Sequence, residues 1–375
     1  MGAQSKGVVM RKWKSALVAL TAVGALALSA CSGSSRGDTA SDPSSGAAGF
    51  PAGSTIGVAL PQKTSENWVL AEGLFNDGLT AAGFKPLVQF ANGGVTEQQN
   101  QIQAMIEQGA KVIVVGAIDG SQLGSQLKAA QDAGIKVIAY DRLLENTANV
   151  DLYVAFDNFK VGVLQGQALL DGLAKQKGSG PYNIELIAGS SDDANSTPFF
   201  QGAMSVLQPK IDDGTLKIPS GQTKFEQATT QGWKAENAQK RMDTILSGFY
   251  AGSTKLDGIL SPNDTLARAA LTSVHQAGKP NPVITGQDSE VESVKLIMAG
   301  TQYSTIYKDT RELVAKTIDQ VKLAQQGQPF EVNDTKTYNN GVKVVPAFLL
   351  DPKIVTKDNA AQVYANDPNL APLTK

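Results

Sequence analysis

Charged and amide side chains recur directly after short apolar segments of this chain, and two tryptophans accompany them. The segments that carry them are 63–68, 141–142, 190–195, 231–233, 263–264, 287–288 and 308–309, and the two tryptophans in them are Trp68 and Trp233. A carboxylate accepts hydrogen bonds, Arg and Lys donate them, and Asn does both. Sugar hydroxyls need both kinds of partner, and an indole can cover the apolar C–H face of a pyranose ring. The residue types therefore favour a neutral sugar as ligand.

Other kinds of chemistry have little support in the sequence. Neither a Walker A motif nor G-x-G-x-x-G follows any expected strand, so no phosphate cradle is predicted. His275 is the only histidine and Cys31 the only cysteine, which leaves no Ser/His pair and few metal ligands. We expect His275 on a helix surface. The G-x-S-x-G match at 33–37 lacks the strand and helix that a nucleophile elbow requires. The sequence predicts no metal, no cofactor and no catalytic residue.

Several residues in these segments also have an ordinary structural explanation. Asp141, Asp264 and Asp288 all stand where a helix can begin, and a carboxylate there can serve as an N-cap. Trp68 and Trp233 can simply fill the core. Sequence alone leaves both explanations open.

The elements that must position these side chains follow an alternating pattern of short apolar runs and longer amphipathic stretches. That pattern is typical of parallel sheets with helices on both faces, and ligands bind beyond the carboxyl ends of such strands. We expect strands at 55–60, 86–90, 112–115, 136–139, 153–156, 184–187, 258–260, 283–285, 303–307 and 342–350. Helices are expected at 66–82, 96–108, 121–133, 161–173, 199–207, 235–246, 266–277, 291–298 and 312–325. The result is two α/β halves.

The first 31 residues have the layout of an export signal. Four basic residues between positions 6 and 14 precede a 14-residue apolar run from 16 to 29, which is too short to span a bilayer. Leu28-Ser29-Ala30-Cys31 resembles the lipobox of bacterial lipoproteins. We therefore expect residues 1–30 to be a signal peptide and Cys31 to be lipidated, which would anchor the protein to the outer face of the cell membrane. An ordinary secretion signal followed by a free thiol is the alternative.

The segment that follows, 31–53, is rich in Ser, Gly, Ala, Asp and Pro and is expected to be a flexible linker. The whole chain has a formal charge of −2, and its first 30 residues carry four positive and no negative side chains, which leaves residues 31–375 at −6. A nucleic-acid partner is not expected, because phosphate binding requires a basic surface.

Several segments resemble the periplasmic monosaccharide-binding proteins of ABC importers, of the xylose-binding and multiple-sugar receptor type. The similar segments are AYDRL (139–143), FDN (156–158), SPND (261–264), GQD (286–288), YSTIYKDTREL (303–313) and VNDTKTYNNGVKVVP (332–346). The resemblance implies a periplasmic binding protein type I fold and places eight residues on the sugar: Trp68, Asp141, Arg142, Asn195, Trp233, Asn263, Asp288 and Lys308. Asn67, beside Trp68, is the ninth expected sugar contact. In those proteins an Arg precedes the first tryptophan, where this chain has Asn67, so its preferred sugar is open.

The resemblance also implies a monomer of two doubly wound lobes joined by a three-segment hinge. Its crossings are expected near 157–158, 307–309 and 345–347. The N-terminal lobe would be 54–157 plus 309–346, and the C-terminal lobe 158–308 plus 347–375. The expected function is capture of xylose, glucose, galactose or arabinose by lobe closure and delivery to a membrane permease. Alternatives are a sugar sensor that docks on a chemoreceptor or sensor kinase, and a secreted glycosidase that uses two of the carboxylates.

Overall fold

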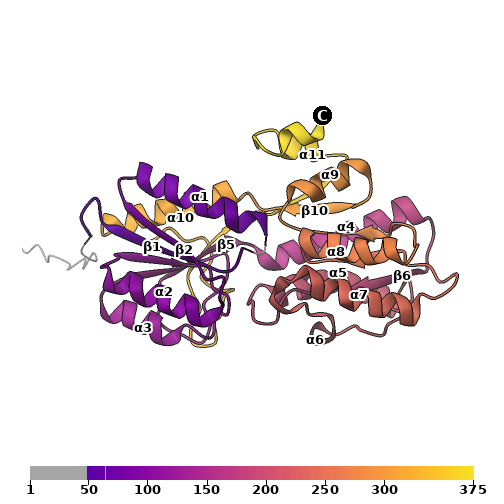
Figure 1. Ribbon diagram of the computed structural model, residues 1–375, viewed down its shortest axis with the longest axis horizontal. Coiled ribbons are helices and arrows are strands. Elements are labelled where there is room, and N and C mark those ends of the chain that lie inside the picture. Colours follow the sequence, from indigo (N-terminus) through magenta and orange to yellow (C-terminus); the bar gives the residue numbers. More distant parts are fainter. Residues whose placement is uncertain (1–48, 64) are drawn as a thin grey trace, which may run out of the picture. The chain divides into compact units, whose positions relative to one another are not determined.

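The computed structural model describes residues 49–63 and 65–375 of the chain. The expected signal peptide (1–30), Cys31 and most of the expected linker (31–53) lie outside these residues. Two lobes, each a sheet covered by helices on both faces, make up the described part (Figure 1). Within residues 49–63 and 65–375, no helix combines the length and the apolar composition needed to cross a membrane.

The first lobe is built on a six-stranded sheet whose neighbouring strands are all parallel. Its strand order is β11-β5-β4-β3-β1-β2. In chain order the strands are β1 (Thr55–Leu60), β2 (Lys85–Phe90), β3 (Val112–Val115), β4 (Lys136–Tyr140), β5 (Leu152–Phe156) and β11 (Ala347–Leu350). Its helices are α1 (Glu66–Ala81), α2 (Val95–Glu107), α3 (Gly124–Asp132) and α10 (Thr310–Gln325).

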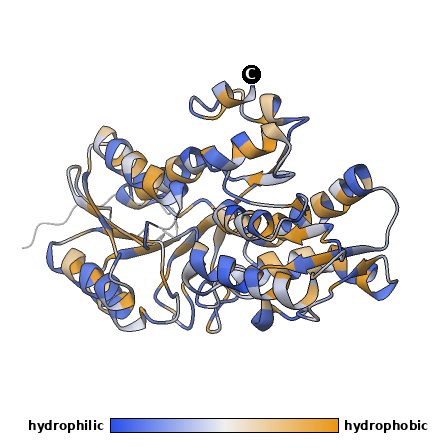
Figure 2. Ribbon diagram, turned by 45° about the vertical axis from the view of Figure 1, so that its right-hand side comes forward, coloured by the Kyte–Doolittle hydropathy of each residue, from blue (hydrophilic) through white to orange (hydrophobic). Residues whose placement is uncertain are grey.

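The continuous apolar strands of this sheet are buried on both faces. In β3, Val112 and Val114 pack into the core shared with α1 and α10, whereas Ile113 and Val115 pack into the core shared with α2 and α3. Successive side chains of a strand point to opposite faces, so an unbroken run of branched residues serves both layers. Figure 2 shows the same division, with hydrophobic residues along the strands and alternating colours along the helices.

The second lobe contains a parallel sheet of order β7-β6-β8-β9. Its strands are β6 (Tyr182–Leu186), β7 (Leu216–Lys217), β8 (Gly258–Leu260) and β9 (Val283–Ile284). Its helices are α4 (Asn158–Lys177), α5 (Ser196–Asp212), α6 (Phe225–Ala228), η1 (Gln231–Trp233), α7 (Ala235–Phe249), α8 (Asp264–Gln276) and α9 (Val291–Ala299). A Cβ on Gly162 of α4 would lie 2.0 Å from the Phe199 carbonyl oxygen of α5, so only glycine allows these two helices to pack this closely.

A two-stranded antiparallel ribbon, β10 (Ser304–Tyr307) with β12 (Lys353–Thr356), adjoins this lobe. The C-terminal helices α11 (Ala360–Val363) and η2 (Ala371–Thr374) follow it. Tyr364 and Leu370 pack with Val294 of α9 and with Tyr307 of β10 in one buried cluster. The C-terminal tail of the chain therefore packs against α9 and β10.

Most expected elements are observed with ends shifted by a few residues, but the expected strand 342–350 is wrong over its first half. Val342 and Val344 are exposed, and the strand begins only at Ala347. That strand, β11, pairs in parallel with β5 of the first sheet. Residues 347–350, expected in the C-terminal lobe, therefore form part of the sheet of the first lobe.

Candidate functional site

One pocket brings together side chains from the carboxyl ends of strands in both lobes. All nine residues predicted from the sequence line it. They are Asn67, Trp68, Asp141, Arg142, Asn195, Trp233, Asn263, Asp288 and Lys308. Ser65, Asp193, Phe199 and Gln287 complete the lining. The pocket is partly open, and the empty space between its walls, solvent included, is about 360 Å³.

The first lobe contributes the start of α1 and the turn after β4. Trp68, in the first turn of α1, is buried and packs edge-on against Tyr140 at a ring distance of 6.1 Å. Gly116 makes room for the indole, since a Cβ there would lie 3.1 Å from Trp68 Cζ3. The Arg142 guanidinium lies 5.3 Å from the centre of the same ring. Trp68 is thus both a core residue and one wall of the pocket.

The second lobe contributes the turns that follow β6, β8 and β9, together with η1 and Lys308 after β10. Trp233 of η1 packs so closely on Gly189 that a Cβ there would lie 2.2 Å from Trp233 Cζ2. The Asn263 Oδ1 atom accepts a hydrogen bond from the Leu266 amide at 2.9 Å and caps α8. Asn263 therefore has a structural role in addition to its place in the pocket.

Three pocket residues other than glycine have a left-handed backbone: Asp141 (φ 60°), Trp233 (φ 56°) and Asp288 (φ 91°). Ser289, next to Asp288, also has a positive φ of 52°. Side chains with a Cβ adopt this region only at an energetic cost, and such residues concentrate at functional sites. The backbone is strained at the positions that aim these side chains into the pocket.

A buried cation lies between two carboxylates on one side of the pocket. Lys308 Nζ is 3.3 Å from Asp288 Oδ1 and 3.7 Å from Asp141 Oδ2. Burial lowers the pKa of Lys308, but Asp288 and Asp141 more than offset this, so its pKa lies above the ordinary value. Burial raises the pKa of Asp288, with Lys308 acting against the shift and Asp141 adding to it. The lysine stays charged, and the two carboxylates compete for it.

Asp288 Oδ1 is ion-paired with Lys308 but meets no aligned hydrogen-bond donor in the described part of the chain. This oxygen atom is buried. Gln287 Oε1 is also buried and has no hydrogen-bond donor among the described residues. A buried acceptor without a donor is costly, so both atoms are suited to hydroxyl donors of a bound ligand.

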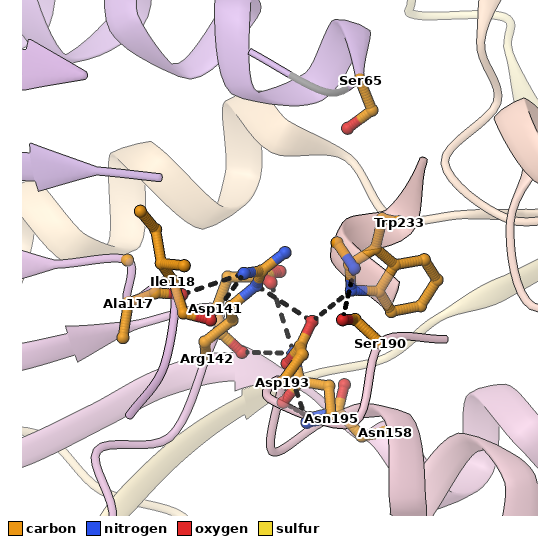
Figure 3. Close-up of polar contacts among 12 residues, drawn as sticks. Ser65, Ala117, Ile118, Asp141, Arg142, Asn158, Ser190, Asp193, Asn195 and Trp233 are labelled. Atoms are coloured by element: carbon orange, nitrogen blue, oxygen red, sulfur yellow. Dashed lines mark hydrogen bonds and ion pairs between the residues drawn. The ribbon is translucent and has the colours of Figure 1, made fainter. Parts of the chain in front are cut away.

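Across the pocket, Arg142 and Trp233 both contact the same carboxylate oxygen of Asp193 (Figure 3). Asp193 Oδ2 lies 3.0 Å from Arg142 Nε and accepts a hydrogen bond from Trp233 Nε1 at 3.0 Å. Arg142 also donates to the Ala117 carbonyl oxygen at 2.9 Å. Burial raises the pKa of Asp193 although Arg142 opposes the shift. These contacts fix the orientation of the guanidinium and of the indole.

Asn195 links the second lobe to the turn at Asp141 in the first lobe (Figure 3). Its Nδ2 atom donates to the Asp141 carbonyl oxygen at 2.9 Å, and its Oδ1 atom accepts from Asn158 Nδ2 at 2.9 Å. The Tyr153 hydroxyl donates to the same Asp141 carbonyl at 2.7 Å. The turn with positive φ at Asp141 is thereby held by two hydrogen bonds.

The structure separates the helix-cap explanation from the pocket explanation. Asp141 and Asp288 line the pocket and do not cap a helix. The N-cap of α8 is Asn263, and α9 begins after Glu290, two residues beyond Asp288. Asp264 is outside the pocket and fully buried, and it accepts hydrogen bonds from the Glu290 amide, Thr305 Oγ1 and Gln302 Nε2. His275 lies on the exposed surface of α8, as expected.

Four further lining residues are not among those predicted from the sequence. Asp193 and Gln287 adjoin Asn195 and Asp288 in segments that follow strands, so their position was a usable signal. Phe199 was read only as the start of a helix, but α5 begins at Ser196, which places Phe199 in the first turn. Ser65 precedes α1 and carries no distinctive signal.

The pocket offers acceptors, donors and aromatic faces, which suits a small neutral polar ligand. Among residues 49–63 and 65–375, no three His, Cys, Asp or Glu side chains are grouped so that they could hold a metal ion.

Residues 56–329 match the periplasmic binding protein domain family. The chain belongs to this family. Its members bind solutes without converting them, so the chain is a binding protein and the glycosidase alternative is excluded. The expected α/β architecture with two parallel-sheet lobes is confirmed.

Among its relatives, this periplasmic binding protein is 48% identical over 314 residues to the multiple sugar-binding periplasmic receptor ChvE of Rhizobium radiobacter, covering 82% of this chain and 88% of that one. It is 36% identical over 313 residues to the D-xylose-binding periplasmic protein of Escherichia coli, covering 83% and 89%. A solved solute-binding protein from Clostridium phytofermentans with bound β-D-glucose is 36% identical, with a TM-score of 0.82 and coverage of 86% and 100%.

Proposed function

We propose that this protein captures an aldopyranose monosaccharide outside the cytoplasm and delivers it to an ABC importer. The observation that carries the proposal is the buried Asp288 carboxylate, whose Oδ1 atom has no aligned donor among the described residues, in a pocket walled by two indoles. Relatives named for binding multiple sugars and D-xylose, and a similar structure with bound glucose, support it.

In this proposal each lining residue has a role that its chemistry allows. Asp288 and Asp141 accept from hydroxyls, Lys308 and Arg142 donate, and the amides of Asn67, Asn195 and Asn263 contribute either kind of bond. Trp68 and Trp233 cover the C–H faces of the ring. Micromolar affinity, about −8 kcal/mol, spread over roughly 11 heavy atoms is near −0.7 kcal/mol per atom, within the limit for small ligands.

We further propose that the sugar is trapped when the two lobes close about three crossings of the chain. These are Asp157–Asn158, 307–309 and 350–353. The first lobe would then be 54–157 plus 309–350, and the second 158–308 plus 351–375. Hinges of this kind concentrate large backbone changes in a few residues at the ends of elements, and each of these crossings joins the ends of elements in different lobes.

The membrane anchor on Cys31 also stays a proposal, supported by the sequence Leu-Ser-Ala-Cys and by the basic and apolar segments before it. A tethered receptor would remain near its permease through the linker 31–53, and it would act as a monomer.

Titration of the purified protein with D-xylose, D-glucose, D-galactose and L-arabinose tests the function. We expect one of them to bind at one molecule per chain with micromolar affinity, and to be recovered chemically unchanged. Failure of all four to bind would refute the sugar class, and recovery of a converted product would refute the receptor.

A further inference from the structure

A second cavity adjoins the pocket. It is partly open, with about 580 Å³ of empty space between its walls, solvent included, and it shares Asn67, Asp288 and Lys308 with the pocket's lining. Because the same three side chains line both spaces, a ligand held against Asp288 and Lys308 would have the second cavity directly beside it. Asn67 is the one of these three that comes from the first lobe, at the start of α1.

The charged groups around the second cavity already have partners. Asp309 pairs with Arg311 at 2.6 Å, and Asp367 accepts from the Tyr307 hydroxyl at 2.8 Å. Glu290 pairs with Arg268 at 2.6 Å. Glu66 Oε2 accepts from the Val291 amide at 2.9 Å. A group entering this cavity would therefore gain few strong polar bonds.

What remains available in the lining is mostly apolar or neutral. Leu70, Val291 and Leu370 line the cavity, together with the neutral polar residues Thr310 and Asn369. Leu70 is 39% exposed, so its side chain retains surface that a ligand can cover. Of the charged residues in the lining, only Lys308 is basic and five are acidic: Glu66, Asp288, Glu290, Asp309 and Asp367. This excess disfavours an anion.

We propose that the second cavity holds a neutral glycosidic substituent of the sugar bound in the pocket, so that the protein binds glycosides as well as free monosaccharides. This inference rests on the proposed function. Asn67 lines both spaces, and the substituent passes beside its side chain.

The first test compares the free sugar that binds best with its phenyl glycosides in both anomers, its p-carboxyphenyl glycosides and a disaccharide. One anomer of the phenyl glycoside should bind within about tenfold of the free sugar, and its carboxyphenyl counterpart at least about tenfold more weakly. The disaccharide arm distinguishes a second sugar ring from an aryl group as occupant. If the free sugar binds and no neutral glycoside of either anomer does, the cavity inference alone fails. If the free sugar does not bind, both proposals fail.

Two neighbouring substitutions on α1 locate the substituent. Leu70→Trp fills the second cavity and does not touch the pocket, whereas Val69 lines neither space and is 48% exposed. Leu70→Trp should weaken the phenyl glycoside by about tenfold or more and leave the free sugar within about twofold, because only the substituent loses its space. Val69→Trp should change neither. Equal glycoside affinity in wild type and Leu70→Trp would overturn the assignment.

Discussion

Arg142 Nε lies 3.0 Å from Asp193 Oδ2, an ion pair that joins the turn after β4 in the first lobe to the segment after β6 in the second. The same oxygen accepts the indole N–H of Trp233. One carboxylate thus orients a donor from one lobe and an aromatic wall from the other. Removing either partner would leave a buried polar group uncompensated.

Asp193→Asn tests this arrangement. The amide can still accept from Trp233 but no longer balances the Arg142 charge, so we expect sugar affinity to fall by about 10- to 100-fold, or roughly 1.4–2.8 kcal/mol. Calorimetric titration measures the loss. Asp192→Asn is the matched control, because that neighbouring side chain lies outside the pocket and should bind like wild type. Equal loss in both variants would contradict a specific role for Asp193.

The raised pKa of Asp288 predicts how sugar binding depends on pH. Hydroxyls that donate to Asp288 favour its charged form, so binding is coupled to proton loss. Because burial raises its pKa above 3.8 in the ligand-free protein, affinity should rise with pH through that raised pKa and fall below it. Titrations in buffers of different ionisation enthalpy should show proton release on the acidic side. Stronger binding as the pH falls would contradict this role.

The same raised pKa predicts the stability of the ligand-free protein. A carboxyl group that holds its proton more tightly in the folded state destabilises the fold once it ionises. With burial as the main cause, Asp193, Asp264, Asp288, Glu185 and Glu290 all have raised pKa values. The free energy of unfolding of the ligand-free protein should therefore fall as the pH rises from about 4 through the raised pKa values of these carboxyl groups. Ligand-free thermal unfolding measured across that range checks the direction.

Tyr364→Phe tests whether the C-terminal tail positions the sugar site. The Tyr364 hydroxyl donates to Ser289 Oγ at 2.7 Å, and Ser289 and Asp288 form the turn with two positive φ angles. Loss of this bond should cost about 1 kcal/mol of stability and reduce sugar affinity several-fold. In a double-mutant cycle with Ser289→Ala, the two effects on affinity should not add. Strict additivity would mean that the hydroxyl acts elsewhere.

Cys31→Ser tests the membrane anchor. Two acyl chains on Cys31 would hold the protein stably, where one chain is marginal. We expect the variant to leave the washed membrane fraction and appear in the soluble extracytoplasmic fraction, while its sugar affinity stays unchanged. Cys31Ser protein that persists in washed membranes would rule out lipidation at this residue.

The two α/β halves and the segments after their strands could be predicted because they depend on local pattern, and the resemblance of motifs such as AYDRL and GQD singled out the individual lining residues. Runs such as Val112–Val115 can only be strands buried on both faces, and residues directly after parallel strands share one edge. Asp193 could not be separated from Asp192 in the same way, because which of two adjacent aspartates faces inward depends on the turn from Ser190 to Asn195. The sequence contains both residues but not the direction of their side chains.

The sheet to which Ala347–Leu350 belong could not be predicted because strand pairing is not local. Ala347–Leu350 resemble the preceding residues in hydropathy, yet only their pairing with β5 places them in the first sheet. The second cavity was equally beyond reach, since it depends on Leu70 and Leu370 coming together from opposite ends of the chain.

Sugar titration of wild type and Asp288→Ala is the most direct test of the central claim. If Asp288 accepts from hydroxyls in a closed pocket, alanine leaves them unpaired, and affinity should fall by about 30- to 1000-fold, or roughly 2–4 kcal/mol. Circular dichroism should show that the variant remains folded. Micromolar, one-to-one binding by wild type together with this loss is the result the account predicts. Unchanged sugar affinity in Asp288→Ala would contradict it.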